Sequence, residues 1–146
     1  MHLYSMIIDS PDFNDAVRQI QTLKKEGKGG NIIVRAHDPL FNRKIMERSD
    51  VSMLLSPEIH SRKDSLKQRD SGLNEFMCKL AKKNNIRIGI DIKRIQSFDK
   101  REQAIIISRL LQNIFLGKKI GCRFVLYPEG QLKKQDSAAI LRVLGT

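Results

Sequence analysis

The sequence predicts an α/β fold with a parallel sheet, and three observations support this. Short apolar runs that are typical of strands alternate with segments in which apolar residues recur at helical spacing. Several of these helical segments have capping residues at their expected ends. No linker, internal repeat or low-complexity segment interrupts the alternation. With 146 residues and 40% hydrophobic content, the chain can bury a real core, so we expect one domain over residues 1–146.

The first half of the chain contains three predicted strands, at residues 4–9, 31–36 and 51–55. Ser10 and Pro11 predict an N-cap and first helical position, and Gly27 predicts the end of that helix. The apolar face of this helix consists of Phe13, Ala16, Val17, Ile20 and Leu23. Asp38 is expected to cap a short helix that carries Leu40, Ile45 and Met46. The segment GKGG before Asn31 precedes a strand and lacks the GxxxxGK[ST] order, so we do not interpret it as a phosphate loop.

The second half contains a helix over residues 73–84, strands over residues 86–92 and 122–127, and a long helix between those strands. Asp99 and Glu102 resemble a capping box at the start of the long helix, and Gly121 ends it. Its buried stripe is predicted from the spacing of Ile107, Leu110, Leu111 and Ile114. Asp136 or Ser137 is expected to cap a last helix.

The net charge of +11 and the pI near 10 favour a polyanionic partner, with nucleic acid ahead of an anionic membrane surface. The alternative is a basic protein that has no such partner. Aromatic residues are few, and most of the phenylalanines are expected in the core: Phe13, Phe76, Phe115 and Phe124. We therefore expect contacts to the backbone phosphates of structured RNA or DNA instead of stacking on single-stranded bases.

The two cysteines, Cys78 and Cys122, stand in apolar contexts without the spacing of metal ligands. They are expected to be small buried hydrophobes in a reducing compartment. No apolar run reaches the length of a membrane span, and the amino terminus lacks the apolar region of a signal peptide. We therefore expect a soluble protein of the cytoplasm.

The segment over residues 56–74 connects a strand to a helix and is far longer than such loops usually are. Basic and acidic side chains alternate along it, and Ser71 is the expected N-cap of the next helix, with Gly72 in the first turn. Basic groups around a helix N-terminus suit a phosphate ligand. The alternative is a solvated charged loop that only connects two elements.

In parallel α/β sheets, ligands bind beyond the carboxyl ends of the strands. Several polar clusters are expected at that edge: His37 with Asp38, the 56–72 loop, Lys93 with Arg94, and the turn at residues 128–130. Together these clusters predict a surface that binds the phosphates of a nucleic acid. Lys118 and Lys119 fall at the opposite end, where they complement the dipole of the long helix.

Residues 54–85 resemble the signature region of the archaeal and eukaryotic ribonuclease P protein component 3 family. The matching positions in this sequence are Pro57, Lys63, Asp64, Gln68, Arg69, Ser71, Gly72, Leu73 and Asn74. Weaker similarity extends over residues 31–127 and includes Asn42 and Arg43. The resemblance implies a fold of the TIM-barrel type and a protein subunit of the ribonucleoprotein that removes 5′ leaders from precursor tRNA.

The resemblance also implies which partners the chain has and which subunit carries out catalysis. The ribonuclease P RNA carries the catalytic Mg²⁺ ions, so no catalytic residue, metal ligand or cofactor is assigned to the protein. The expected partners are this RNA, precursor tRNA, protein component 2 and other protein subunits. Five strands are fewer than the eight of a barrel, so the barrel is expected to be shortened or incomplete. Its open edges predict self-association or packing against component 2.

The rival hypothesis is a metal-dependent phosphoesterase on a barrel-type fold that acts without RNA. Its candidate ligands are the acids and histidines expected near the strand ends: His37, Asp38, Glu58, His60 and Asp91. No His-x-His pair or matched ligand set supports it. We therefore predict an RNA-binding site formed by Arg43, Arg62, Lys63, Lys67, Gln68, Arg69, Asn74, Lys93 and Arg94.

Overall fold

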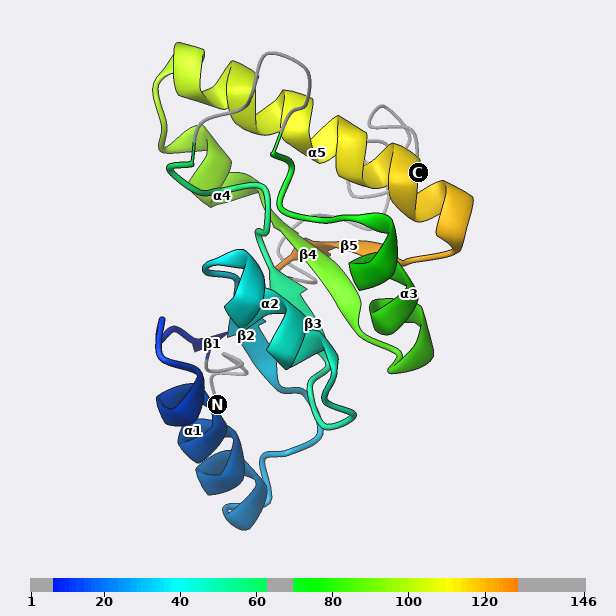
Figure 1. Ribbon diagram of the computed structural model, residues 1–146. Coiled ribbons are helices and arrows are strands. Elements are labelled where there is room, and N and C mark those ends of the chain that lie inside the picture. Colours follow the sequence, from blue (N-terminus) through cyan, green and yellow to red (C-terminus); the bar gives the residue numbers. More distant parts are fainter. Residues whose placement is uncertain (1–6, 63–69, 129–146) are drawn as a thin grey trace.

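The computed structural model describes residues 7–62 and 70–128, and these form five strands and five helices (Figure 1). The strands are β1 (Ile7–Ile8), β2 (Ile33–Arg35), β3 (Met53–Leu55), β4 (Arg87–Asp91) and β5 (Phe124–Tyr127). The helices are α1 (Phe13–Lys25), α2 (Pro39–Met46), α3 (Glu75–Lys83), α4 (Ile92–Gln96) and α5 (Lys100–Ile120). The alternation of strands and helices predicted from the sequence is confirmed. The predicted last helix lies outside the described residues.

All five strands are parallel and follow one another in sequence order across one open sheet. Consecutive neighbouring strands joined by helices are the arrangement found in successive β/α units of a barrel. Within the described residues, β1 and β5 are the edges of the sheet, so the barrel-like arrangement remains open. The prediction of a shortened parallel β/α fold with about five strands is therefore confirmed.

The helices cover one face of the sheet. Every second strand residue, such as Val34, Leu54 and Ile88, joins buried residues of α1, α2 and α3 in the main core. A second cluster packs Ile90 and Leu126 against α4 and α5. Figure 1 shows α2 and α3 in front of the strands, with α5 crossing the end of the layer. The opposite face has its own small cluster of Ile33, Met53 and Leu55.

Two helix starts differ from the sequence prediction. The N-cap of α1 is Asp12, whose carboxylate accepts the N–H of Asn14, while Ser10 accepts the N–H of Asp12 one turn earlier. The N-cap of α3 is Asn74 instead of Ser71. Ser71 is buried and donates its hydroxyl to the Leu73 carbonyl oxygen, so it closes a turn before the helix begins. The predicted caps Asp38 and Asp99 are confirmed.

On part of α5, the residues that the sequence predicted to be buried lie one position away from the residues that are buried. Leu110 and Ile114 are buried as expected, and Ile106 joins them. Ile107 and Leu111 are exposed, and Phe115 is 76% exposed. The helix carries isoleucine and leucine in adjacent positions, so the spacing alone did not determine which set faces the sheet. Phe76 of α3 was also expected in the core and is 54% exposed.

Candidate nucleic-acid interface

Because all strands are parallel, their carboxyl ends lie along one side of the sheet, which we call the carboxyl-terminal edge to distinguish it from the edge strands β1 and β5. His37 follows β2, the 56–74 segment follows β3, and Lys93 and Arg94 follow β4. The predicted gathering of these residues at one edge is therefore confirmed for the described part of the chain. Asp91 ends β4 and caps α4, where its carboxylate accepts the N–H of Arg94 at 3.2 Å.

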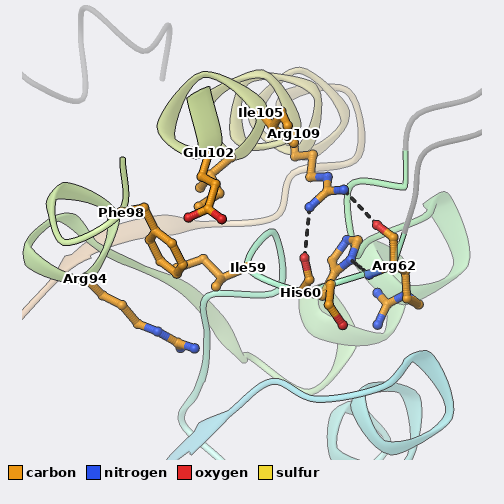
Figure 2. A pocket seen from close by; sticks show the side chains of 10 residues that line it. Ile59, His60, Arg62, Arg94, Phe98, Glu102, Ile105 and Arg109 are labelled. Carbon is orange, nitrogen blue, oxygen red and sulfur yellow. Dashed lines mark hydrogen bonds between the residues drawn. The ribbon is translucent and has the colours of Figure 1, made fainter. Parts of the chain in front are cut away.

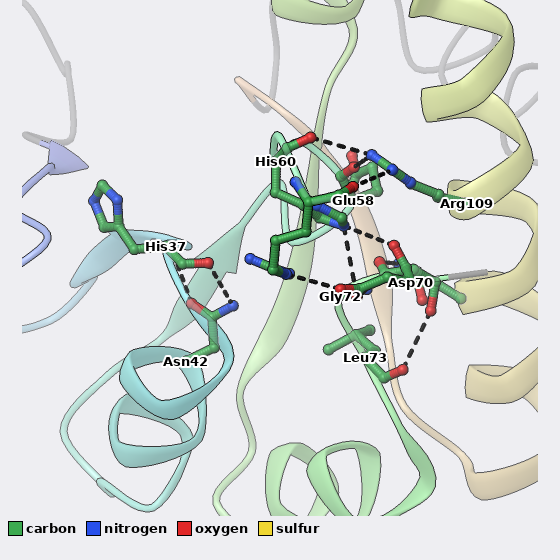
Figure 3. Close-up of polar contacts among 11 residues, drawn as sticks. His37, Asn42, Glu58, His60, Asp70, Gly72, Leu73 and Arg109 are labelled. Carbon is green, nitrogen blue, oxygen red and sulfur yellow. Dashed lines mark hydrogen bonds and ion pairs between the residues drawn. The ribbon is translucent and has the colours of Figure 1, made fainter. Parts of the chain in front are cut away.

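The base of the long segment after β3 is closed by a pair of contacts to Asp70 (Figure 3). The Nε2 atom of His60 lies 2.6 Å from the Asp70 carbonyl oxygen, and the Nε atom of Arg62 lies 2.8 Å from the Asp70 carboxylate. Burial lowers the pKa of His60, which favours a neutral ring that donates from Nε2 and accepts the Arg62 N–H at Nδ1. The hydrogen bond from Arg62 lowers the pKa of Asp70. The two ends of the loop are thus tied together.

Two polar side chains of α5 hold this loop base from the other side. Arg109 is buried and donates to the carbonyl oxygens of His60 at 3.2 Å and Arg62 at 2.9 Å. Asn113, one turn further along, donates to the Ser71 carbonyl oxygen at 2.8 Å. Figure 3 shows the guanidinium of Arg109 directed at the loop. A buried cation that satisfies several backbone carbonyls fixes the path of a segment that lacks regular hydrogen bonding.

Gly72 is required by the same closure. Its φ of +87° lies in the left-handed region, and a Cβ atom there would lie 2.0 Å from the Pro57 carbonyl oxygen. The absence of a side chain at Gly72 thus allows two backbone segments to approach closely. Gly72 does not lie in the first turn of α3, because that helix begins at Glu75.

Asn42 stabilises the neighbouring turn between β2 and α2. Its carboxamide oxygen accepts the His37 N–H at 2.7 Å, and its nitrogen donates to the His37 carbonyl oxygen at 3.3 Å. Asn42 is fully buried, so this pair of bonds holds the turn without help from solvent. The structure therefore gives this motif residue a role in positioning His37 at the carboxyl-terminal edge (Figure 3).

Ionisable groups are partly or fully buried at the same edge. Glu58 is fully buried, and burial raises its pKa to about 7 in spite of the nearby Arg94. Burial also lowers the pKa of Arg94, and the neighbouring Arg35 adds to this effect. Arg35 in turn lies 3.3 Å from the carboxylate of Asp9. Such clusters of perturbed groups occur more often at functional sites than elsewhere, although structural networks also produce them.

The predicted RNA-binding residues fall into three groups. Lys93 is exposed in α4, and Arg94 is half-buried beside it, so both lie at the carboxyl-terminal edge. Arg62 and Asn74 form the loop base, where Arg62 pairs with Asp70 and Asn74 accepts the Met77 N–H at 2.8 Å. Lys63, Lys67, Gln68 and Arg69 lie outside the described residues.

Arg43 comes from a different element of the chain. It lies in the last turn of α2, which runs back from the carboxyl-terminal edge. Its Nε atom is 3.2 Å from the Glu47 carboxylate, and its guanidinium carbon is 5.8 Å from the centre of the Phe76 ring. Arg43 therefore contacts the first turn of α3, two residues after the cap Asn74.

The residues of the rival metal site do not form a ligand set in the described part of the chain. Within residues 7–62 and 70–128, no group of three or more histidine, cysteine, aspartate or glutamate side chains could hold a metal ion. Asp38 is used as the cap of α2, and the ring of His60 is used in the loop base. Among the same residues, no helix is long and apolar enough to cross a membrane.

Sequence reasoning missed Arg109 and Asn113, which organise the site from a distant helix. The signal was present, because an arginine and an asparagine four residues apart lie within the buried face that includes Leu110 and Ile114. Polar residues at such positions need buried partners. Their partners, however, are backbone carbonyls more than forty residues away in the chain, as the separations of 47 and 42 positions show.

Comparison with known proteins adds a structural relative. No protein-family model matches the chain, and no curated protein matches it. Among solved structures, the fold is similar to a chain in a cryo-EM structure of archaeal ribonuclease P with mature tRNA. The TM-score is 0.72 and the sequence identity 24%. The similarity covers 95% of this chain but 58% of that chain, so this chain spans little more than half the length of its structural relative.

Proposed function

We propose that this chain is a protein subunit of ribonuclease P, related to component 3, that binds and stabilises the catalytic RNA. The observation that carries the proposal is the correspondence of 95% of the chain with the fold of a chain in archaeal ribonuclease P. The signature residues in the 57–74 segment support the same family, and the net charge of +11 suits a polyanionic partner.

The proposed mechanism is electrostatic. The clamp formed by Arg109, Asn113 and Asp70 holds the ends of a loop that contains Lys63, Lys67, Gln68 and Arg69. Lys93 and Arg94 lie at the same sheet edge and extend the cationic surface. Arg62, Asn74 and Arg43 are assigned to the RNA contact as well, in addition to the intramolecular bonds that they make. These groups neutralise phosphates where RNA helices crowd together and release bound counterions.

In this proposal, the RNA subunit catalyses the cleavage of precursor tRNA. In this assignment the chain contributes no catalytic residue and binds no cofactor, and Mg²⁺ is held by the RNA subunit. The chain then acts in the cytoplasm with precursor tRNA, component 2 and further protein subunits. A phosphoesterase that acts alone remains the alternative, and it predicts EDTA-sensitive cleavage of phosphodiesters without any RNA cofactor.

Reconstitution tests the proposal directly. Purified ribonuclease P RNA and partner proteins are assayed for cleavage of precursor tRNA at modest Mg²⁺ concentration, with and without this chain. We expect the chain to increase the cleavage rate. Equal rates in its presence and absence would contradict the assignment, and cleavage by the isolated chain would favour the phosphoesterase.

A further inference from the structure

A cavity of about 740 Å³ lies beside the loop base, between α4, the first half of α5 and residues 59–62 (Figure 2). Ile59, Phe98, Ile105 and Ile106 form apolar walls. The volume is in the range that holds small organic ligands. Arg62, Arg94 and Arg109 line the cavity and have roles described above, whereas its apolar walls and Glu102 have none.

The polar groups of the cavity differ in whether they already have hydrogen-bond partners within the protein. Arg109 is committed to the carbonyl oxygens of the loop base. The carboxylate of Glu102 points into the cavity in Figure 2 and forms no ion pair with any residue in the described ranges. Its backbone N–H is already used by the Asp99 cap. Glu102 is exposed, and its carboxylate offers the cavity two acceptor oxygens in addition to the hydroxyl of Ser61.

The aromatic wall is held firmly. Phe98 is half-buried and packs against the cluster that contains Ile90, Ile95 and Ile106. Figure 2 shows its ring beside Glu102 and Ile59. The opposite wall is fixed by the hydrogen bonds from Arg109 to residues 60 and 62, so the cavity is preorganised. Arg94 lies at the rim beyond Phe98.

We propose that this cavity binds an unstacked guanine base of the RNA partner. An extruded base needs an aromatic or apolar wall for its face and a hydrogen-bonding group for its Watson–Crick edge. Phe98 supplies the ring, and Ile59 and Ile105 supply the facing apolar surface. Guanine carries two adjacent donors, N1–H and N2–H, that match the two oxygens of a carboxylate, so Glu102 selects guanine over the other bases.

The contents of the cavity favour a base over an apolar side chain of a protein partner. A base offers hydrogen-bond donors to the exposed carboxylate of Glu102, which an aliphatic side chain cannot do. The cavity also shares His60 and Arg62 with the base of the basic loop, and Arg94 can contact the phosphate of the same nucleotide. This inference rests on the proposed function, because it names the base that accompanies the phosphate contacts.

The test compares two fluorescently labelled RNAs with the full chain, a short oligouridine and the same strand with one central guanosine. We expect the guanosine strand to bind about tenfold more tightly, since one good bidentate contact discriminates between bases by that order. Inosine lacks the N2 amino group and should lose most of the gain. Glu102→Gln should abolish the preference while leaving the affinity for oligouridine unchanged.

Matched variants separate the cavity from general effects. Glu75→Gln removes a carboxylate from the first turn of α3, away from the cavity, and should keep the preference for guanosine. Phe98→Leu retains an apolar side chain but loses the aromatic face, and should reduce the preference several-fold. Phe115→Leu alters an exposed ring of α5 outside the cavity and should leave it intact.

The possible failures are distinguishable. If neither RNA binds, the proposed function fails and the guanine site fails with it. If both RNAs bind equally and the binding depends on the basic loop, RNA binding stands and the guanine site is overturned. It is also overturned if Phe98→Leu and Glu102→Gln leave both RNA affinities unchanged but weaken the binding of component 2, because the cavity would then belong to a protein interface.

Discussion

At the scale of single residues, the loop base depends on groups that have no substitute. Gly72 combines a left-handed φ with a backbone contact that leaves no room for a Cβ atom. Arg109 and Glu58 are both buried ionisable groups, but they are accommodated differently. Arg109 is satisfied by backbone carbonyls, whereas burial raises the pKa of Glu58 to about 7. Each of these features leads to a measurable effect.

Replacing Gly72 with alanine should destabilise the protein strongly. The added Cβ atom meets the Pro57 carbonyl oxygen, and the left-handed backbone adds its own cost, so we expect a loss of roughly 2–4 kcal/mol in the free energy of unfolding. Gly27→Ala is the matched control, because Gly27 also has a positive φ, of +74°, but open space around it. It should cost about 1 kcal/mol. Urea denaturation measures both, and equal losses would contradict the role of the close approach.

Glu58 should make stability depend on pH. Its folded pKa of about 7 lies above the ordinary value of 4.5, so the folded chain binds more protons than the unfolded chain between these values. Stability should therefore fall as the pH rises through this window, and the contribution should be fully lost above it. Relative to the wild type, Glu58→Gln should gain roughly 3 kcal/mol between about pH 4.5 and pH 8.

The measurement for Glu58 is the free energy of unfolding of both proteins across this pH range. Glu47→Gln serves as the control, because Glu47 is exposed and pairs with Arg43 one turn earlier. It should follow the wild-type curve. A constant difference between Glu58→Gln and the wild type at all pH values would show that Glu58 does not titrate in this window.

At the scale of elements, α5 serves two sides of the molecule. One face, with Ile106, Leu110 and Ile114, packs against the sheet, and Arg109 and Asn113 on that side hold the loop. The face with Leu111 and Phe115 is exposed. A helix that is apolar on two sides explains why its pattern was ambiguous in the sequence.

Adjacent leucines of α5 should therefore respond differently to truncation. Leu110→Ala removes a buried side chain and should cost roughly 2–4 kcal/mol of the free energy of unfolding. Leu111→Ala changes a side chain that is 44% exposed and should cost less than about 1 kcal/mol. Thermal or urea denaturation compares the two, and the reverse order would show that the helix is rotated from the position described above.

At the scale of the whole molecule, charge and topology act together. Parallel strands bring segments that are distant in sequence to one edge, and Arg62 and Asp70, which flank the basic 63–69 segment in the sequence, are joined there by an ion pair. Lys118 and Lys119 lie in the last turn of α5, so the same net charge includes cations far from the loop. For RNA binding, the position of the cations therefore matters as much as the net charge of +11.

Salt dependence should separate these two groups of cations. Replacing Lys63, Lys67 and Arg69 with alanine should weaken binding to ribonuclease P RNA and reduce the slope of log affinity against log salt by somewhat under one unit per lost contact, about 0.9 for a duplex. Replacing Lys82, Lys118 and Lys119 removes the same charge elsewhere and should change the slope little. Filter binding over a salt series measures both, and equal effects would reject the loop as the site.

Local sequence patterns were enough to predict the order of strands and helices, the parallel sheet and the gathering of polar segments at one edge. These follow from local periodicity, from caps such as Asp38 and Asp99, and from the geometry of parallel connections. Contacts between neighbours in sequence and the handedness of the chain are sufficient for such conclusions.

The tertiary structure decided what depends on contacts between distant residues. Only the folded chain shows that Arg109 and Asn113 hold the loop and that Leu111 faces outward. The cavity beside Phe98 arises in the same way, from side chains of three separate segments. Helical spacing identifies a face but cannot say which distant groups cover it, because burial is a property of the whole packed chain.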